Sequence, residues 1–113
     1  MFDAKYVRGY ITKDVTERID EFWQWFSYYQ YQVLEAMNKT PKDTSVVYVI
    51  DEELRSIFNE YKKPLCFEFG MEDGKCHFYF HFGRSSYLLT VASELFDTMP
   101  RELKTNWAFH LEK

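Results

Sequence analysis

The chain has few of the residues that interrupt regular secondary structure. Its 113 residues include only 3 prolines and 4 glycines, so long elements joined by short loops are expected. The glycines are too dispersed for a phosphate-binding loop, and no Gly-x-Ser-x-Gly motif indicates a nucleophilic serine. Two cysteines are too few for a disulfide framework. These shortages point away from nucleotide-binding and hydrolase motifs, and we expect a protein that is not an enzyme.

Basic charge and long apolar runs are also lacking. The 18 Asp and Glu residues outnumber the 14 Lys and Arg residues, and the net charge is −4. Nucleic-acid binding needs a basic surface, so no direct binding is expected, and membranes are disfavoured for the same reason. No apolar run approaches the ~18 residues of a membrane span, and the N-terminus lacks the apolar stretch of a signal peptide. We expect one cytoplasmic domain over residues 1–113.

Aromatic residues, by contrast, are abundant, at 20% of the chain, and many of them fall in an amphipathic segment at 14–38. Apolar side chains recur there at alternating spacings of three and four, which predicts a helix with a buried stripe. Asp14 and Glu17 are expected to form a capping box at its start. The expected buried stripe consists of Val15, Ile19, Phe22, Phe26, Tyr29, Val33 and Met37.

Two further helices are indicated. Residues 43–60 follow helical spacing, although a β-branched run within them competes for strand, and Pro41 is expected in the first turn. The third helix is expected to be capped by Ser85 or Ser86 and to end near Asp97.

The strongest strand pattern covers residues 65–82, where two alternating runs flank Asp73-Gly74. This dipeptide predicts a two-residue hairpin turn, which places Phe69 opposite Phe78. In this register Cys66 and Cys76 lie on opposite faces, so no disulfide between them is expected. The apolar face is then Leu65, Phe67, Phe69, Met71, Cys76, Phe78, Phe80 and Phe82.

Strands are also expected at residues 4–12 and 105–111. The element order is then strand, two helices, hairpin, helix and strand. We expect an α+β two-layer sandwich of ferredoxin-like type, with an antiparallel-containing sheet, all helices on its phenylalanine face and an extra helix in the first crossover.

Histidines gather on the other face of the expected sheet. His77 and His81 lie four residues apart on one strand, roughly 13 Å at about 3.4 Å per residue, so they cannot share a metal ion with ligand distances of roughly 2 Å. Cys66 with His81 would supply only two ligands. We therefore expect no metal and no cofactor, and a half-exposed polar face that is a secondary candidate for ligand binding: Glu68, His77, Tyr79, His81 and His110.

The negative charge is concentrated in the first helix. Residues 14–38 carry a net −4, and the rest of the chain sums to zero. At roughly 100° per residue, carboxylates and tyrosines fall opposite the buried stripe. One interpretation is a solvated helix face with acids near its N-terminus, as the helix dipole favours. The other is a partner-binding surface made of Glu17, Glu21, Trp25, Tyr28, Tyr31 and Glu35.

Three short motifs lie in the first helix, the first hairpin strand and the C-terminal segment: Phe22-Trp23-Gln24-Trp25-Phe26, Pro64-Leu65-Cys66-Phe67-Glu68-Phe69-Gly70, and Met99-Pro100 with Leu103 and Trp107-Ala108-Phe109. They resemble a loose group of small uncharacterised bacterial proteins, distantly similar to the ferredoxin-like regulator of ribonuclease E activity. The resemblance covers most of residues 15–110. It implies a bacterial, cytosolic, non-catalytic protein and supplies no catalytic residues.

These features favour a non-enzymatic inhibitor or regulator that binds another protein with a basic surface. The most concrete form is an immunity-type protein that neutralises a bacterial toxin, such as a nuclease, because a phosphate-binding cleft is basic. The resemblance favours a housekeeping regulator of an RNA-processing enzyme. A third alternative is a small-ligand-binding protein that uses the open sheet face.

Overall fold

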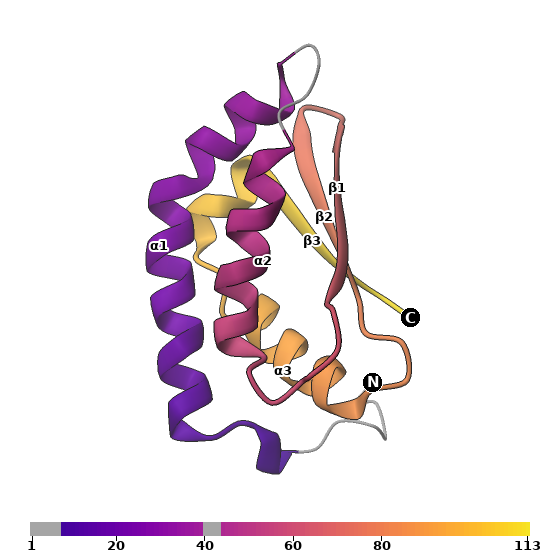
Figure 1. The fold of residues 1–113 in the computed structure, drawn as a ribbon. Helices are drawn as coiled ribbons and strands as arrows, with labels where there is room; N and C mark the ends of the chain where they lie inside the picture. Colours follow the sequence, from indigo (N-terminus) through magenta and orange to yellow (C-terminus); the bar gives the residue numbers. More distant parts are fainter. Residues whose placement is uncertain (1–7, 40–43) are drawn as a thin grey trace.

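The computed structural model describes residues 8–39 and 44–113, which form an α+β fold. Figure 1 shows the helices on one side of a sheet, as in a two-layer sandwich. The described elements are the 3₁₀ helix η1 (Arg8–Tyr10), helices α1 (Lys13–Met37) and α2 (Ser45–Ile57), strands β1 (Cys66–Glu72) and β2 (Lys75–His81), helix α3 (Ser86–Asp97), the 3₁₀ helix η2 (Arg101–Thr105) and strand β3 (Trp107–Glu112).

Helix α1 confirms the predicted first helix but begins differently. The N-cap is Thr12, in an extended conformation, whose hydroxyl accepts a hydrogen bond from the Val15 backbone N–H at 3.2 Å. The expected capping box at Asp14 is therefore wrong. Asp14 lies in the first turn of the helix, where a carboxylate still interacts favourably with the helix dipole.

Helices α2 and α3 are also confirmed. The β-branched run of α2 is helical, because Val46, Ile50 and Leu54 bury one face of it. Residues 40–43, including the expected first-turn Pro41, lie outside the described residues. Helix α3 is capped by Ser85, whose hydroxyl accepts from the Leu88 backbone N–H at 3.0 Å.

The hairpin has the predicted register. Phe69 pairs with Phe78 and Glu72 with Lys75. The turn residues Asp73 and Gly74 both have positive φ, 53° and 78°, as a two-residue primed turn requires. The alternation of side chains along β1 and β2 is therefore as expected, with one apolar and one polar face.

Strand β3 pairs in parallel with β2, so the sheet is mixed, with order β1-β2-β3. The predicted strand at 4–12 is wrong over residues 8–12, where the chain forms η1 and the cap of α1; residues 4–7 lie outside the described residues. A ferredoxin-like sheet would place that first strand between the last two. Here the last two strands are direct neighbours, and the ferredoxin-like topology is not confirmed.

The core lies between the apolar face of the sheet and the helices. Phe58, at the end of α2, stacks on Phe80 with ring centroids 5.1 Å apart. Trp23 of α1 contacts Phe109 at 5.3 Å, and Phe96 of α3 contacts the same ring at 5.2 Å. All three helices thus pack on the phenylalanine face. No helix among the described residues is both long and apolar enough to cross a membrane.

Candidate functional site

The outward side of α1 presents the residues that the sequence predicts there. We call Glu17, Glu21, Trp25, Tyr28, Tyr31 and Glu35 the α1 face. Tyr28 is 88% exposed and Tyr31 is 66% exposed, while the three glutamates are exposed and Trp25 is half-buried. The helical spacing correctly predicted that the glutamates and tyrosines point outward, while Trp25 lies at the edge of this face and packs partly against the core.

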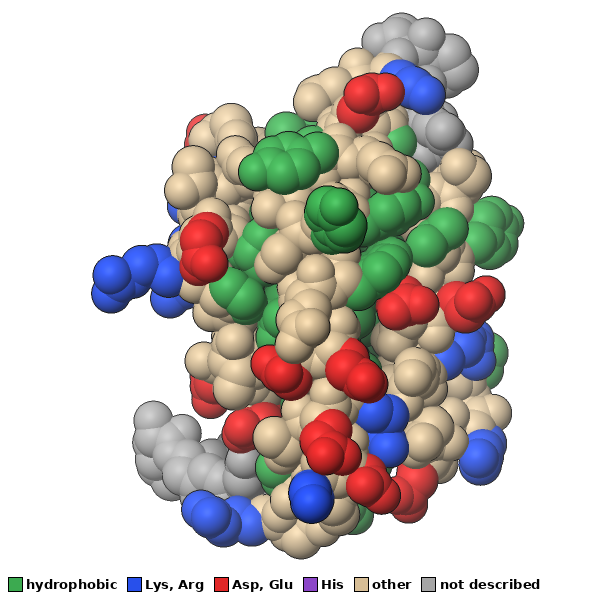
Figure 2. Space-filling model, turned by 90° about the vertical axis from the view of Figure 1, so that its left-hand side faces the viewer, with side chains coloured by type: hydrophobic (Ala, Val, Ile, Leu, Met, Phe, Trp, Pro, Cys, Tyr) green, Lys and Arg blue, Asp and Glu red, His purple; other side chains and the backbone are tan. Residues whose placement is uncertain are grey.

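Charge and aromatic character separate along this helix. Figure 2 shows the acidic side chains gathered over the lower part of this side of the molecule and hydrophobic side chains over the upper part. The separation follows from the sequence, because four acids fall between Asp14 and Glu21 and the tyrosines begin at Tyr28. A partner would therefore meet a charged half and an aromatic half on one helix.

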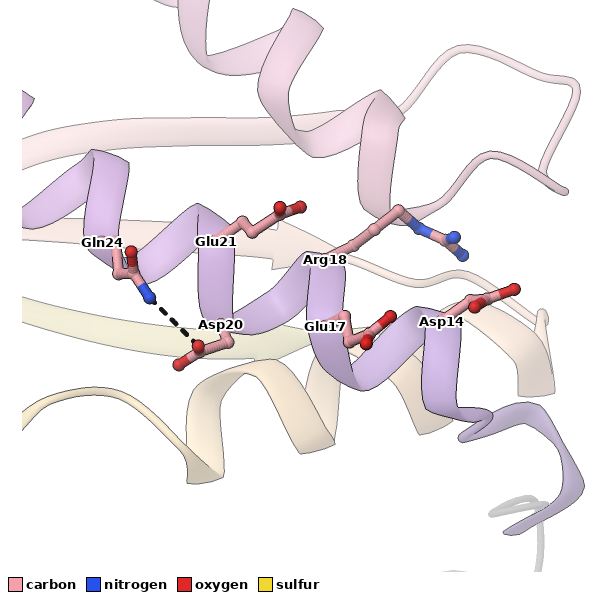
Figure 3. A pocket seen from close by; sticks show the side chains of 6 residues that line it. All are labelled: Asp14, Glu17, Arg18, Asp20, Glu21 and Gln24. Carbon is pink, nitrogen blue, oxygen red and sulfur yellow. Dashed lines mark hydrogen bonds between the residues drawn. The ribbon is translucent and has the colours of Figure 1, made fainter.

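The acidic half is a hollow of about 500 Å³ lined by Asp14, Glu17, Arg18, Asp20, Glu21 and Gln24. In Figure 3, Arg18 and Glu21 point to the side of α2, while Glu17 and Asp20 point to the side of α3. The Gln24 amide donates to a carboxylate oxygen of Asp20 at 3.1 Å. Among the described residues of this lining, Arg18 is the single basic side chain, so their charges sum to a negative value.

The aromatic half is bordered by a pair of stacked rings. The rings of Trp25 and Tyr29 stack with centroids 4.9 Å apart and an interplanar angle of 21°. A hollow of about 190 Å³ is lined by Trp25, Tyr28, Tyr29 and Gln32. The sequence pattern placed Tyr29 in the buried stripe, but this side chain is only half-buried, because its position lies at the edge of that stripe.

Helix α2 adds exposed apolar surface that the sequence analysis did not assign to a site. Tyr48 is 77% exposed and Val49 is 39% exposed. The signal was present in the helical spacing, because both residues lie off the buried stripe that contains Val46 and Ile50.

The open sheet face brings the secondary candidates together as two pairs. His77 Nδ1 lies 2.9 Å from His110 Nε2, with ring planes 6° apart and centroids 5.1 Å apart. These values describe two nearly coplanar rings joined head to head by one hydrogen bond. Tyr79 stacks on His110 at 4.8 Å, and His81 Nε2 lies 2.9 Å from a carboxylate oxygen of Glu68.

The same face offers little for metal binding. No group of three or more His, Cys, Asp or Glu side chains converges anywhere in residues 8–39 and 44–113. Cys66 is exposed and opposite His81, while Cys76 is buried on the other face. The polar side chains of this face mainly form hydrogen bonds with one another.

One half-buried tyrosine, Tyr87 of α3, has a shifted pKa. Burial raises the pKa of Tyr87, and the charge of Glu60 adds to the rise. The positive charge of Arg18 acts in the opposite direction. The Tyr87 ring packs edge-on against Tyr10 at 5.3 Å, so this cluster joins η1 to α3.

Comparison with known proteins gives no identification. No family model matches the chain, and neither a curated protein nor a solved structure is similar enough to count as a match.

Proposed function

We propose that this protein is a non-catalytic inhibitor that binds another protein through the α1 face. Its most concrete form is a cytoplasmic immunity-type protein that neutralises a bacterial toxin. The observation that carries the proposal is the pair Tyr28 and Tyr31, at 88% and 66% exposure, on the helix face that also presents exposed carboxylates.

The solvated-helix alternative explains only half of this face. Acids in the first turns of a helix are stabilised by its dipole, which accounts for Asp14 and Glu17. It does not account for two large aromatic rings in water. Tyrosine is enriched in protein interfaces and at their energetic centres, so the aromatic half favours a binding surface.

The charge of α1 favours a basic partner. Complementary charge accelerates encounter, and a rim of carboxylates excludes acidic competitors. A nuclease has a basic cleft because its substrate is a chain of phosphates. An acidic helix with tyrosine anchors has the charge needed to occupy such a cleft.

The first experiment identifies the partner by position-specific crosslinking. A photoreactive benzoylphenylalanine replaces Gln24, which is exposed on α1 between the acids and the tyrosines. The matched control carries the same residue at Glu52, exposed on α2. In the cells that make this protein, we expect one basic protein to crosslink from position 24 and not from position 52. The same products from both positions would contradict a specific α1 interface.

The second experiment uses the purified partner. An equimolar amount of wild-type protein should abolish the partner's activity, and the Tyr28→Ala variant should inhibit more weakly. An RNA-processing enzyme as partner would instead support the housekeeping regulator, the form that the family resemblance favours. Equal inhibition by all α1 variants would leave the open sheet face as the leading site.

A further inference from the structure

A third concavity lies beside the α1 face, between α1 and the C-terminal end of α3. Its volume is about 300 Å³, at the lower end of the range for small-ligand pockets. Ile19, Trp23 and Pro100 give it an apolar floor, and Glu17, Asp20 and Glu94 supply carboxylates around that floor.

The floor is held in place by the core. The Trp23 indole N–H donates to the backbone oxygen of Leu95 at 2.9 Å, which ties α1 to α3. Ile19 and Trp23 are each only 3% exposed, so their positions are set by packing. A ligand entering this pocket would meet a surface that needs little reordering, which lowers the cost of binding.

The carboxylates of the pocket carry no matching positive charge. None of its lining residues in the described part of the chain is Lys or Arg. Asp20 accepts a hydrogen bond from Gln24, whereas Glu17 and Glu94 form no ion pair within the described residues. The pocket therefore combines an apolar floor with uncompensated negative charge from two different helices.

We propose that this pocket binds an arginine side chain of the partner protein. The aliphatic stem would cover the apolar floor while the charged end stays with the carboxylates. The guanidinium fork donates in several directions in one plane, so a single arginine in the pocket has donors for carboxylates from both α1 and α3. The identity of the occupant as a partner residue rests on the proposed function, but the chemistry of the pocket does not.

The pocket can be tested without the partner by NMR titration of the ¹⁵N-labelled protein. The probes are N-acetylarginine amide and its neutral isostere, N-acetylcitrulline amide. We expect arginine to shift the Trp23 indole N–H and the Ile19 amide in a saturable manner. Citrulline should cause no more than slight shifts, and the buried Trp107 indole should not respond to either probe. Equal shifts with both probes, or no saturable shift at Trp23, would overturn the proposal.

Variants then assign the carboxylates. Glu17→Gln and Glu94→Gln should each weaken arginine binding by about three- to tenfold, as expected for the loss of one charge-assisted hydrogen bond. Glu35→Gln is the control, because it removes the same charge from α1 outside the pocket. Equal weakening by all three variants would indicate general attraction and contradict a defined site.

The two proposals fail separately. If arginine causes no saturable shift, the proposed arginine site is wrong, but the proposal that the partner binds through Tyr28 and Tyr31 is unaffected. If the partner binds Tyr28→Ala normally but loses affinity for Glu94→Gln, the arginine site is supported and binding through the tyrosines of the α1 face is contradicted.

Discussion

The α1 face and the open sheet face are both polar and rich in aromatic residues, but their side chains are used differently. On the sheet, His77 pairs with His110 and His81 with Glu68. On α1, the side chains of Glu17, Glu21, Glu35, Tyr28 and Tyr31 have no hydrogen bond, ion pair or ring contact within the described residues. Apart from the buried His77 Nε2, which has no hydrogen-bond partner among the described residues, these sheet groups already bond to one another and gain little from a ligand. The side chains of the α1 face are still free to form hydrogen bonds and ring contacts with a partner, which is why we place the interface there.

The sharpest test of the sheet register is the reactivity of its two thiols. Cys66 is exposed and Cys76 is buried on the opposite face. Labelling of Cys76 requires an opening of the core, so it should be at least ~10³-fold slower than labelling of Cys66. A thiol-reactive dye followed by mass spectrometry measures both rates, and both thiols should react equally in denaturant. Fast labelling of Cys76 in the native protein would show that the two faces are wrongly assigned.

Neighbouring residues on β2 test which face supports the fold. Phe80 is completely buried and stacks on Phe58, so Phe80→Ala should reduce the free energy of unfolding by about 3–5 kcal/mol. Tyr79→Ala, on the open face, should reduce it by about 1 kcal/mol or less. Urea denaturation provides both values. Similar losses at the two positions would remove the distinction between a core face and an open face.

The aromatic half of α1 should act through affinity and not through stability. Tyr28→Ala should weaken partner binding by about 2 kcal/mol or more, mainly by faster dissociation, if the ring is an anchor. The free energy of unfolding should change by about 0.5 kcal/mol or less. Tyr48→Ala, which removes a similarly exposed ring from α2, is the control in surface plasmon resonance. Equal effects of the two changes would indicate that exposure alone, and not position on α1, decides binding.

The carboxylates of the α1 face should act through the association rate. Glu21→Lys combined with Glu35→Lys should slow association by about tenfold at low ionic strength. The effect should shrink as added salt shortens screening to roughly 8–10 Å. Stopped-flow mixing at several salt concentrations measures this dependence. A rate change that is independent of salt would contradict electrostatic steering.

The smallest expected effect concerns alkaline stability. The pKa of Tyr87 is raised above its ordinary value by burial, so its contribution to stability is complete below about pH 10 and is lost as the pH rises beyond that. Tyr87→Phe should therefore show a smaller loss of stability than wild type between about pH 8 and about pH 11. Tyr28→Phe, at an exposed position, should leave the wild-type profile unchanged. Urea midpoints across this range provide the measurement.

The parts of the fold that could be predicted depend on local signals. The hairpin register follows from alternation around Asp73-Gly74, and both α1 and α3 follow from apolar spacing. Residues 8–12 were wrongly assigned as strand because β propensity depends on neighbouring strands that the local sequence does not specify. The cap was misplaced because Thr12 and Asp14 are both good capping residues, and the choice depends on where the extended chain turns into the helix.

The candidate sites also differ in whether local sequence signals could predict them. Helical spacing within residues 14–38 was sufficient to predict the α1 face. The pocket between α1 and α3 was not predictable, because Glu17 and Glu94 lie far apart in the sequence and line one pocket only in the folded chain. The hydrogen bond from Trp23 to Leu95, which ties the two helices together, is also a long-range contact. The parallel pairing of β2 with β3, which brings His110 to His77, is likewise a long-range contact.

The hydrogen bond between His77 and His110 links the tautomers of two residues on different strands. At 2.9 Å between the two nitrogens, one imidazole must donate and the other must accept. If His77 donates from Nδ1, its buried Nε2 is a bare lone pair; if it accepts there, Nε2 carries the hydrogen. Two cationic rings would place donor against donor and break the contact. The tautomer of His77 on β2 therefore fixes the tautomer of His110 on β3, and the reverse is also true.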